Sequence, residues 1–322
     1  MNTPILLAVP NVSEGRDPAA IERIGVAFAR SRPSAKTGSV RLLDVHSDAD
    51  HHRSVFTLAG RAPQLAASLV AGAAAAIDSI DVVKRASGTR ADAGAHPHVG
   101  AIDVVPLVYF DSRARGAASA EALVVGERLG SELGVPVFLY GELAGDTPGR
   151  TRAELRRGGV AGLAARMRAD AASEHASGAT QAREPLRPDF GPSASHPSAG
   201  ATLVAAREPL VAFNLQLQPP ASLQDARRIA AQIREGGERG LPGLRAIGVA
   251  LSGDVAQVSM NVERPLELPL GEVVRTVAKL APVASAELVG LAPRAAFDGF
   301  PAELPMPGFD PDRHLIESAL GL

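Results

Sequence analysis

Two histidines flank a proline in the stretch ADAGAHPHVGAID, residues 91–103. Pro97 has a fixed φ and biases its predecessor away from the α region, so His96 is expected in a stiff loop before the apolar run that starts at Gly100. Imidazole has an unperturbed pKa of about 6.5, which suits His96 for proton transfer near neutral pH. A turn whose histidine bonds only to nearby backbone is the structural alternative.

Clustering of histidines in this part of the chain raises the question of a metal site. Five of the eight histidines fall between residues 46 and 98, namely His46, His51, His52, His96 and His98. Neutral imidazole is a common ligand of zinc, copper and iron. However, the chain contains no H-x-x-x-H pair, no H-E-x-x-H motif and no cysteine, so the spacing argues against a catalytic metal. His51 and His52 also fit solvated loop positions.

A second stretch whose residue types could bind a ligand or take part in catalysis is VPNVSEGRD, residues 9–17. Its apolar start predicts a strand, and Asn11, Ser13 and Glu14 would lie at the end of that strand, before a helix. Such a turn can hold a ligand or can simply connect the two elements.

A third stretch is RPDFGPSASHPSAG, residues 187–200. Gly191 and Gly200 allow a close backbone approach or a positive φ, and the serines between them offer hydroxyls. Free backbone N–H groups in such loops bind anionic or heterocyclic ligands. An inter-domain linker is the alternative.

Composition excludes several classes of protein. The chain has 322 residues, of which 46% are hydrophobic, and a formal net charge of -2, so no strong field favours nucleic acid or an anionic membrane. Without cysteine it can form neither a disulfide nor a thiolate nucleophile. The N-terminus lacks a basic segment followed by a long apolar run, and no apolar run reaches the length of a membrane span. We expect a cytoplasmic protein.

The elements that must position these stretches repeat along the chain. Each half reads as strand, helix, strand, strand, helix, strand, which predicts an α/β (α+β) fold of two ferredoxin-like α/β subdomains with a ligand cleft between them. The expected helices are 17–31, 62–80 and 119–133, then 222–237 and 270–281; the expected strands are 4–12, 40–47, 52–60, 100–110 and 135–143, then 201–207, 210–218, 244–253, 255–263 and 284–292.

Between the halves, residues 165–200 lose apolar periodicity and are expected to be a linker or a functional loop. We therefore expect an N-terminal subdomain at 1–186, a C-terminal subdomain at 187–300 and a tail at 301–322.

Taken together, six ordered motifs resemble the glutamate formimidoyltransferase family, which is also the first half of formimidoyltransferase-cyclodeaminase. They are VPNVSEG (9–15), LLDVHSDADHHR (42–53), GAHPHVGAID (94–103), GVPVFLYGE (134–142), PDFGPS (188–193) and AFN (212–214). The resemblance implies two α/β subdomains around a folate-binding cleft, usually in a homodimer. It also implies transfer of a formimino group from N-formimino-L-glutamate to N5 of tetrahydrofolate, the co-substrate, without a metal.

The same resemblance assigns residues to roles. The catalytic histidine maps to His96. The folate-binding segment maps to Gly191, Pro192, Ser193, Ala194, Ser195, His196, Pro197, Ser198, Ala199 and Gly200. Other candidates for the site are Asn11, Ser13, Glu14, Asp44, His46, Arg53, His98, Asp103 and Asn214.

Three departures from the family pattern fall on the donor side of the expected site. The family has Glu, Arg and Asp where this chain has Ala95, His98 and His46. A dicarboxylic donor needs arginine, whose planar fork pairs with carboxylate, and the candidates are Arg53, Arg187 and Arg207.

Three alternatives to formiminoglutamate transfer are a related folate-dependent transferase with another donor, a non-catalytic folate-binding protein and a metal hydrolase. We expect small-molecule partners and a homodimer, and no cyclodeaminase domain in this chain.

Overall fold

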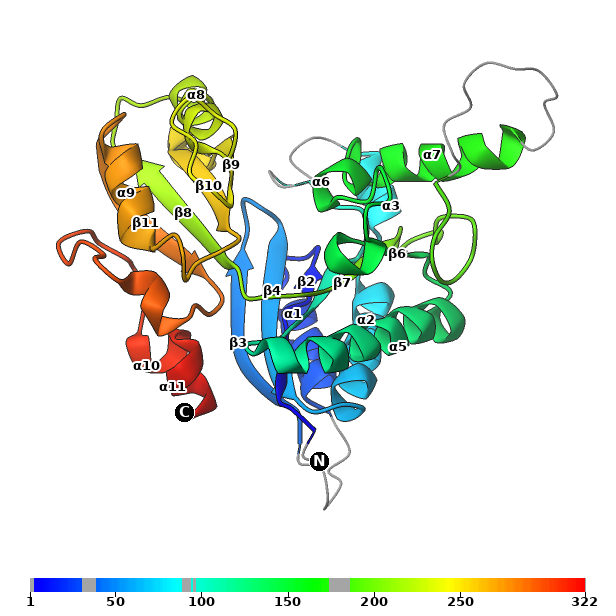
Figure 1. Cartoon of the computed structure of the whole chain (residues 1–322). Coiled ribbons are helices and arrows are strands. Elements are labelled where there is room, and N and C mark those ends of the chain that lie inside the picture. Colours follow the sequence, from blue (N-terminus) through cyan, green and yellow to red (C-terminus); the bar gives the residue numbers. More distant parts are fainter. Residues whose placement is uncertain (1–2, 31–38, 89–93, 95–96, 174–185, 322) are drawn as a thin grey trace. The chain divides into compact units, whose positions relative to one another are not determined.

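The computed structural model describes residues 3–30, 39–88, 94, 97–173 and 186–321. The chain divides into two compact units, residues 1–207 and 208–322 (Figure 1). Both contain helices and a sheet, which confirms the expected mixed α/β fold class.

The first unit contains a seven-stranded sheet and the helices that pack on it. Its strands are β1 (Leu6–Ala8), β2 (Asn11–Val12), β3 (Arg41–Asp48), β4 (Arg53–Gly60), β5 (Ile102–Val108), β6 (Val137–Leu139) and β7 (Thr202–Arg207). Its helices are α1 (Pro18–Ala29), α2 (Gln64–Ser79), α3 (Val82–Ala86), α5 (Arg115–Leu133), α6 (Arg152–Leu155) and α7 (Gly159–Ser173). The 3₁₀ turns η1 (Ser112–Ala114) and η2 (Gly141–Ala144) connect them.

Strand order in the first sheet follows the ferredoxin-like pattern. β1 and β2 together lie between β4 and β5, and β3 pairs with β4 at one edge, all antiparallel. β7 and β6 extend the sheet beyond β5 in parallel. Because β7 belongs to this sheet, the boundary between the units follows Arg207, later than the boundary expected at 186/187.

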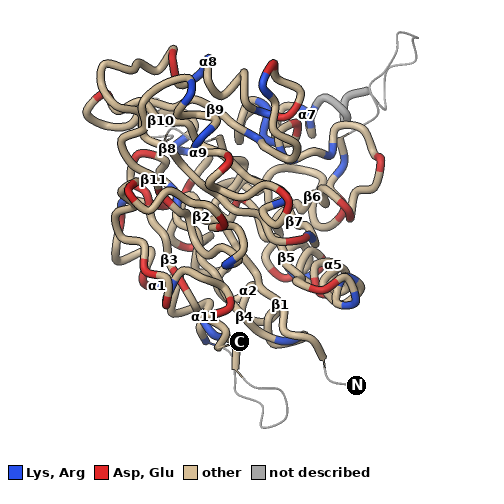
Figure 2. Tube along the Cα trace, turned by 60° about the vertical axis from the view of Figure 1, so that its left-hand side comes forward, with Lys and Arg blue, Asp and Glu red and all other residues tan. Residues whose placement is uncertain are grey.

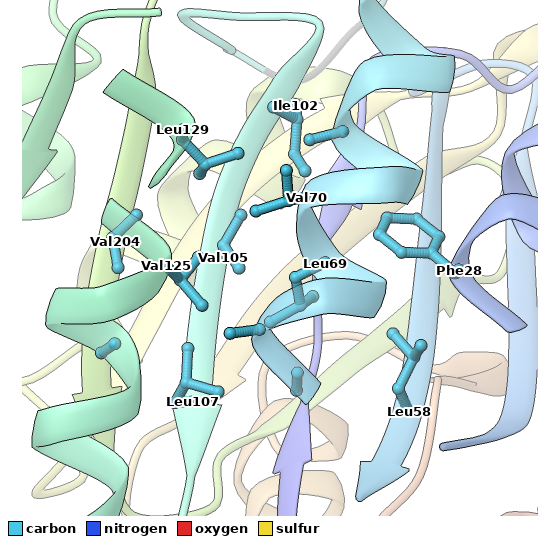
Figure 3. Packing of buried hydrophobic residues seen from close by; sticks show 14 of the residues in the cluster. Phe28, Leu58, Leu69, Val70, Ile102, Val105, Leu107, Val125, Leu129 and Val204 are labelled. Carbon is cyan, nitrogen blue, oxygen red and sulfur yellow. The ribbon is translucent and has the colours of Figure 1, made fainter. Parts of the chain in front are cut away.

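Helices cover one face of the first sheet, as amphipathic patterning predicts. α1 begins where expected: the carboxylate of Asp17 accepts hydrogen bonds from the N–H groups of Ala19 (2.9 Å) and Ala20 (3.1 Å), and Pro18 occupies the first turn. Figure 3 shows side chains of α2 and α5, among them Leu69 and Val125, packed against β5.

We call the opposite side of this sheet the second face. Over β5, β7 and β6 it carries a smaller apolar cluster with α6 and α7.

The second unit is a four-stranded antiparallel sheet with two helices on one face. Its elements are β8 (Val211–Leu217), α8 (Leu223–Ile233), β9 (Leu244–Ala250), η3 (Ser252–Asp254), β10 (Ala256–Val262), α9 (Leu270–Ala278), β11 (Val283–Val289), η4 (Arg294–Phe297), α10 (Pro311–His314) and α11 (Ile316–Leu320). The order β11-β8-β10-β9 is again ferredoxin-like. Ser222 caps α8 as expected, in a capping box with Asp225.

The expected unstructured segment 165–200 is partly wrong. α7 continues to Ser173, because alanine and arginine favour helix even where apolar periodicity is weak. Residues 186–200 form a loop that hydrogen-bonds to the first unit: the carbonyl of Phe190 accepts from Val137 N (2.9 Å). This loop is therefore part of the first unit and does not act as a free linker.

Charges of both signs are interspersed along the chain, as Figure 2 shows. Among the described helices, none combines the length and apolarity that a bilayer crossing requires.

Glu121 of α5 is an acidic side chain in the helix layer, only 4% exposed. Its carboxylate accepts a hydrogen bond from Ala66 N (2.8 Å), at the start of α2. Burial raises the pKa of Glu121, with the hydrogen bond acting in the opposite direction. Glu121 thus satisfies one of the N–H groups that a helix start leaves unpaired.

Replacement of Glu121 tests this contact. We expect Glu121→Ala to lower the free energy of unfolding by about 1–3 kcal/mol, since Ala66 N loses its buried acceptor. Glu121→Gln keeps an acceptor oxygen and should lose less. Chemical denaturation at pH 7 measures both, with Glu127→Ala, exposed on the same helix, as the control. Equal stability of Glu121→Ala and the control would contradict the assignment.

Candidate functional site

Two glycines far apart in the sequence meet at the start of β5. Gly100 and Gly200 form a bridge, flanked by hydrogen bonds from Ala101 N to Ala199 O (2.9 Å) and from Ala201 N to Val99 O (3.0 Å). A Cβ on Gly100 would lie 1.9 Å from Ala201 O, and one on Gly200 would lie 2.3 Å from Val99 O. Only glycine permits this approach, which joins the expected folate loop to the segment that follows the His-Pro step.

The other end of the expected folate loop is held by the PDFG motif. Asp189 accepts hydrogen bonds from Leu139 N and from Arg150 Nη1, both at 2.7 Å. Gly191 has a φ of 81°, and a Cβ there would lie 2.5 Å from Val135 O. The loop is therefore fixed at both ends, while residues 191–194 are exposed.

His196 organises the last turn of this loop. Its Nδ1 accepts hydrogen bonds from Ala199 N (2.9 Å) and Ser198 N (3.3 Å), so this nitrogen carries no proton. Burial lowers the pKa of His196, which also favours the neutral ring. The carbonyl of Ser198 accepts from Val82 N (2.9 Å), which attaches the turn to the start of α3.

Ser13 and Glu14 anchor the first motif beside this junction. Ser13 Oγ donates to Gly100 O (2.7 Å). One oxygen of Glu14 accepts from Arg16 N (2.8 Å), and the other pairs with the Arg85 guanidinium, which also donates to Ser13 O (2.5 Å). Burial would raise the pKa of Glu14, but these hydrogen bonds outweigh it and hold the pKa below its ordinary value.

His52 contacts the same carboxylate from the turn between β3 and β4. It has a φ of 51°, and its Nδ1 lies 3.2 Å from Gly15 N, which donates to it, and 3.4 Å from Glu14 Oε1. Burial, followed by the charge of Arg85, lowers the pKa of His52 to about 4, so the ring is neutral at pH 7. A Cβ on Gly94 would lie 2.7 Å from that of His52, so this turn packs against the start of the His-Pro motif.

The neighbouring His51 forms a separate pair with Asp48. His51 Nδ1 lies 2.8 Å from Asp48 Oδ2, and His51 N donates to Asp48 Oδ1 (2.8 Å). Burial would raise the pKa of Asp48, but the hydrogen bonds from His51 outweigh it and lower the pKa to about 2. With exposures of 4% and 8%, His51 and His52 are buried, so the solvated-loop alternative is wrong for both.

Asp103 is fully buried where the register between β2 and β5 shifts. Its carboxylate accepts from Val99 N (2.8 Å) and pairs with the guanidinium of Arg156, just after α6. The ion pair of Asp103 and Arg156 therefore connects the segment after the His-Pro step to the end of α6, which packs on the second face.

Several expected site residues lie on β2, β3 and β4. Arg53, Val55 and Thr57 alternate with core residues of β4, so they project from the second face. In the antiparallel register Asp48 lies opposite Arg53, His46 opposite Val55 and Asp44 opposite Thr57.

Asn11 lies on β2, the strand that pairs with the other edge of β4, where it is opposite Val55. Its side-chain amide donates to Val9 O (3.0 Å).

Not every expected site residue falls in this group. His98 is half-buried, and its charge contributes to lowering the pKa of His52. Asn214 lies on β8 of the second unit, where its amide donates to Glu287 (2.8 Å). His96 and Ala95 lie outside the described residues.

The described residues contain no group of three His, Asp or Glu side chains that could hold a metal ion. Sequence reasoning missed Arg85 and Arg156 as parts of this group. Arg85 lies outside every helix and strand expected from the sequence. Arg156 belongs to the run LRRGG, in which nothing distinguishes a buried arginine from an exposed one.

Comparison with known proteins shows the family to which the chain is related. Residues 5–207 match the family model described as the formiminotransferase domain, N-terminal subdomain. The chain is 34% identical to glutamate formimidoyltransferase of Streptococcus pyogenes serotype M1, over 98% of both chains. It is also 34% identical to glutamate formimidoyltransferase of Thermoplasma acidophilum, over 94% of this chain and 93% of that one. Identity to formimidoyltransferase-cyclodeaminase of Sus scrofa is 36%, over 89% of this chain and 50% of that longer protein.

Substitution of Gly200 tests the glycine junction. We expect Gly200→Ala to lower the free energy of unfolding by at least about 2 kcal/mol, because the new Cβ meets Val99 O and the residue has a φ of 73°. Gly116→Ala is the matched control, since nothing lies within 4 Å of its Cβ position on α5. Thermal unfolding compares the two; a neutral Gly200→Ala would contradict the close approach.

His52 predicts a pH dependence of stability. Its folded pKa of about 4 lies below the ordinary 6.5, so the unfolded state binds the proton more tightly between these values. The contribution of His52 is therefore present above pH 6.5 and is lost as the pH falls towards 4. His52→Asn, which tolerates a positive φ, should flatten this part of the pH profile measured by denaturant unfolding. Parallel profiles for the two proteins would refute the prediction.

Proposed function

Since the chain belongs to the formiminotransferase family, we propose that it transfers a formimino group from N-formimino-L-glutamate to N5 of tetrahydrofolate. Membership confirms the resemblance seen in the sequence and the expectation of a transferase. The observation that carries the proposal is the junction of Gly100 and Gly200, because it joins the His-Pro segment and the expected folate loop.

The proposed reaction needs one group that moves a proton twice. A bond forms between N5 and the amidine carbon as N5 loses its proton; the bond from that carbon to the glutamate nitrogen then breaks as this nitrogen gains a proton. His96 is proposed to accept the first proton and to donate the second, since imidazole does both near neutral pH. This chemistry needs no metal.

Residues Gly191–Gly200 are proposed to bind the folate. Among the described residues, none accepts a hydrogen bond from the backbone N–H groups of Ser193, Ala194 and Ser195, so these donors are open to a ligand. The loop is fixed at both ends and exposed in its middle, which suits a planar heterocycle that needs hydrogen-bond donors at its edge. In the cell we propose a cytoplasmic homodimer that acts in histidine degradation, as the family resemblance implies.

Substitution of His96 tests the proposed mechanism. We expect His96→Ala to lower kcat at least about 100-fold, because general acid–base help is lost, while the Kd for 5-formyltetrahydrofolate changes less than about threefold. Steady-state kinetics and fluorescence titration measure the two quantities. His314→Gln, in the second unit, is the control and should keep full turnover. An unimpaired His96→Ala would remove His96 from the mechanism.

The donor is tested separately because Ala95, His98 and His46 depart from the family pattern. Formiminoglutamate, formylglutamate and 5-formyltetrahydrofolate are offered in parallel to the wild-type protein. Turnover of formiminoglutamate supports the proposal, and turnover of only another compound supports a different donor. Folate binding without turnover of any of them supports a non-catalytic folate-binding protein.

A further inference from the structure

Arg53 combines partial burial with the absence of a protein partner among the described residues. It lies on the second face at the start of β4 and is half-buried. Among the residues that the structure describes, no oxygen accepts a hydrogen bond from its guanidinium, and no carboxylate forms an ion pair with it. A guanidinium withdrawn from water without a partner is costly, so such a group is usually compensated by a ligand or a counter-charge.

Two carboxylates act on Arg53 electrostatically, those of Asp103 and Asp48, and both are engaged elsewhere. Asp48, directly across the strand pair, is paired with His51, and Asp103 is paired with Arg156. Both acidic groups act on Arg53 only at a distance. Burial, followed by the charge of Arg156, lowers the pKa of Arg53 to about 10, so its surroundings leave positive charge insufficiently compensated.

Arg156 adds a second guanidinium with an unsatisfied donor to the same place. Its side chain is 8% exposed, and its Nε is buried without a hydrogen-bond partner within the described chain. One edge of the guanidinium is thus held by Asp103 while another donor is free. Arg152, one turn earlier, contributes further positive charge to Arg53.

We propose that Arg53 and Arg156 together bind a carboxylate group of the amino-acid donor substrate. The assignment rests on the proposed transferase function for the identity of the donor. Two guanidinium groups offer N–H donors in planar forks, the geometry that matches a carboxylate. Asp103 orients Arg156 for this role and also accepts from Val99 N, so Arg156 is attached to the segment just after the His-Pro step.

Folate also carries carboxylates, on its glutamate tail, but its expected binding segment lies elsewhere. That loop is held by β6 and by the Gly100–Gly200 junction, whereas the arginines approach β4 and the bulge at Asp103. The contact of Asp103 with Val99, three residues after the proposed catalytic His96, favours the donor, whose carboxylate lies only a few bonds from the amidine carbon. The folate tail is an outcome that the test distinguishes.

Arg53→Met provides the main test, since methionine keeps much of the side-chain volume without the charge. We expect the KM for formiminoglutamate to rise at least about 30-fold, because a charge-assisted contact is lost, while the KM for tetrahydrofolate changes less than about threefold. Arg53→Lys, which keeps the charge and loses the fork, should show a smaller rise of about 5–10-fold. Arg128→Met, which removes an arginine from α5, is the matched control and should leave both constants unchanged.

Direct binding separates this proposal from the proposed function. Calorimetric titration with L-glutamate, the expected product, needs no turnover, and Arg53→Met should weaken binding at least about 30-fold. Arg156→Lys, which preserves the ion pair with Asp103, should weaken it about 5–10-fold in a folded protein.

Loss of glutamate binding in Arg53→Met supports the site even if formiminoglutamate proves not to be turned over. Unchanged glutamate binding in an active enzyme would overturn it and leave the transferase function standing. A rise confined to the KM for tetrahydrofolate would also overturn it, because the arginines would then bind the folate tail.

Discussion

The backbone contact between Gly100 and Gly200 is the constraint on which the rest of the first unit depends. Two carbonyls, Ala201 O and Val99 O, occupy the space that a Cβ would need. Because side chains are excluded there, the segment before β5 and the segment before β7 approach closely enough to hydrogen-bond. This contact determines where the His-Pro motif ends and where the loop 191–200 ends, and it does so through backbone atoms alone.

Two ion pairs with buried carboxylates lie beside that contact. Glu14 binds Arg85, and Asp103 binds Arg156, each across a large separation in sequence. Buried ion pairs add little stability when the cost of desolvation is counted, but removal of one partner is expensive. Both pairs hold backbone next to the Gly100–Gly200 contact, through Ser13 O and Val99 N. Arg53, for which the described residues supply no paired carboxylate, is the residue on which the proposed anion site depends.

Much of the fold could be predicted from patterns along the chain. The order of elements predicted two ferredoxin-like halves, and both sheets have that strand order. What could not be predicted was the extension of the first sheet: β7 follows a long segment of low periodicity, yet it pairs in parallel with β5 and β6. Parallel pairing over such a distance leaves no local turn signal, so the end of the first unit was placed too early.

The sequence by itself determined the local features: Asp17 and Ser222 as helix caps, and the glycines that end the loop 191–200. These depend on backbone conformation within a few residues, which residue type controls directly. Only the tertiary structure decided which charges meet, because Arg85 and Glu14 are 71 residues apart and Arg156 and Asp103 are 53 apart. Such pairings follow from strand order and helix placement, and the residue types alone do not show which arginine meets which carboxylate.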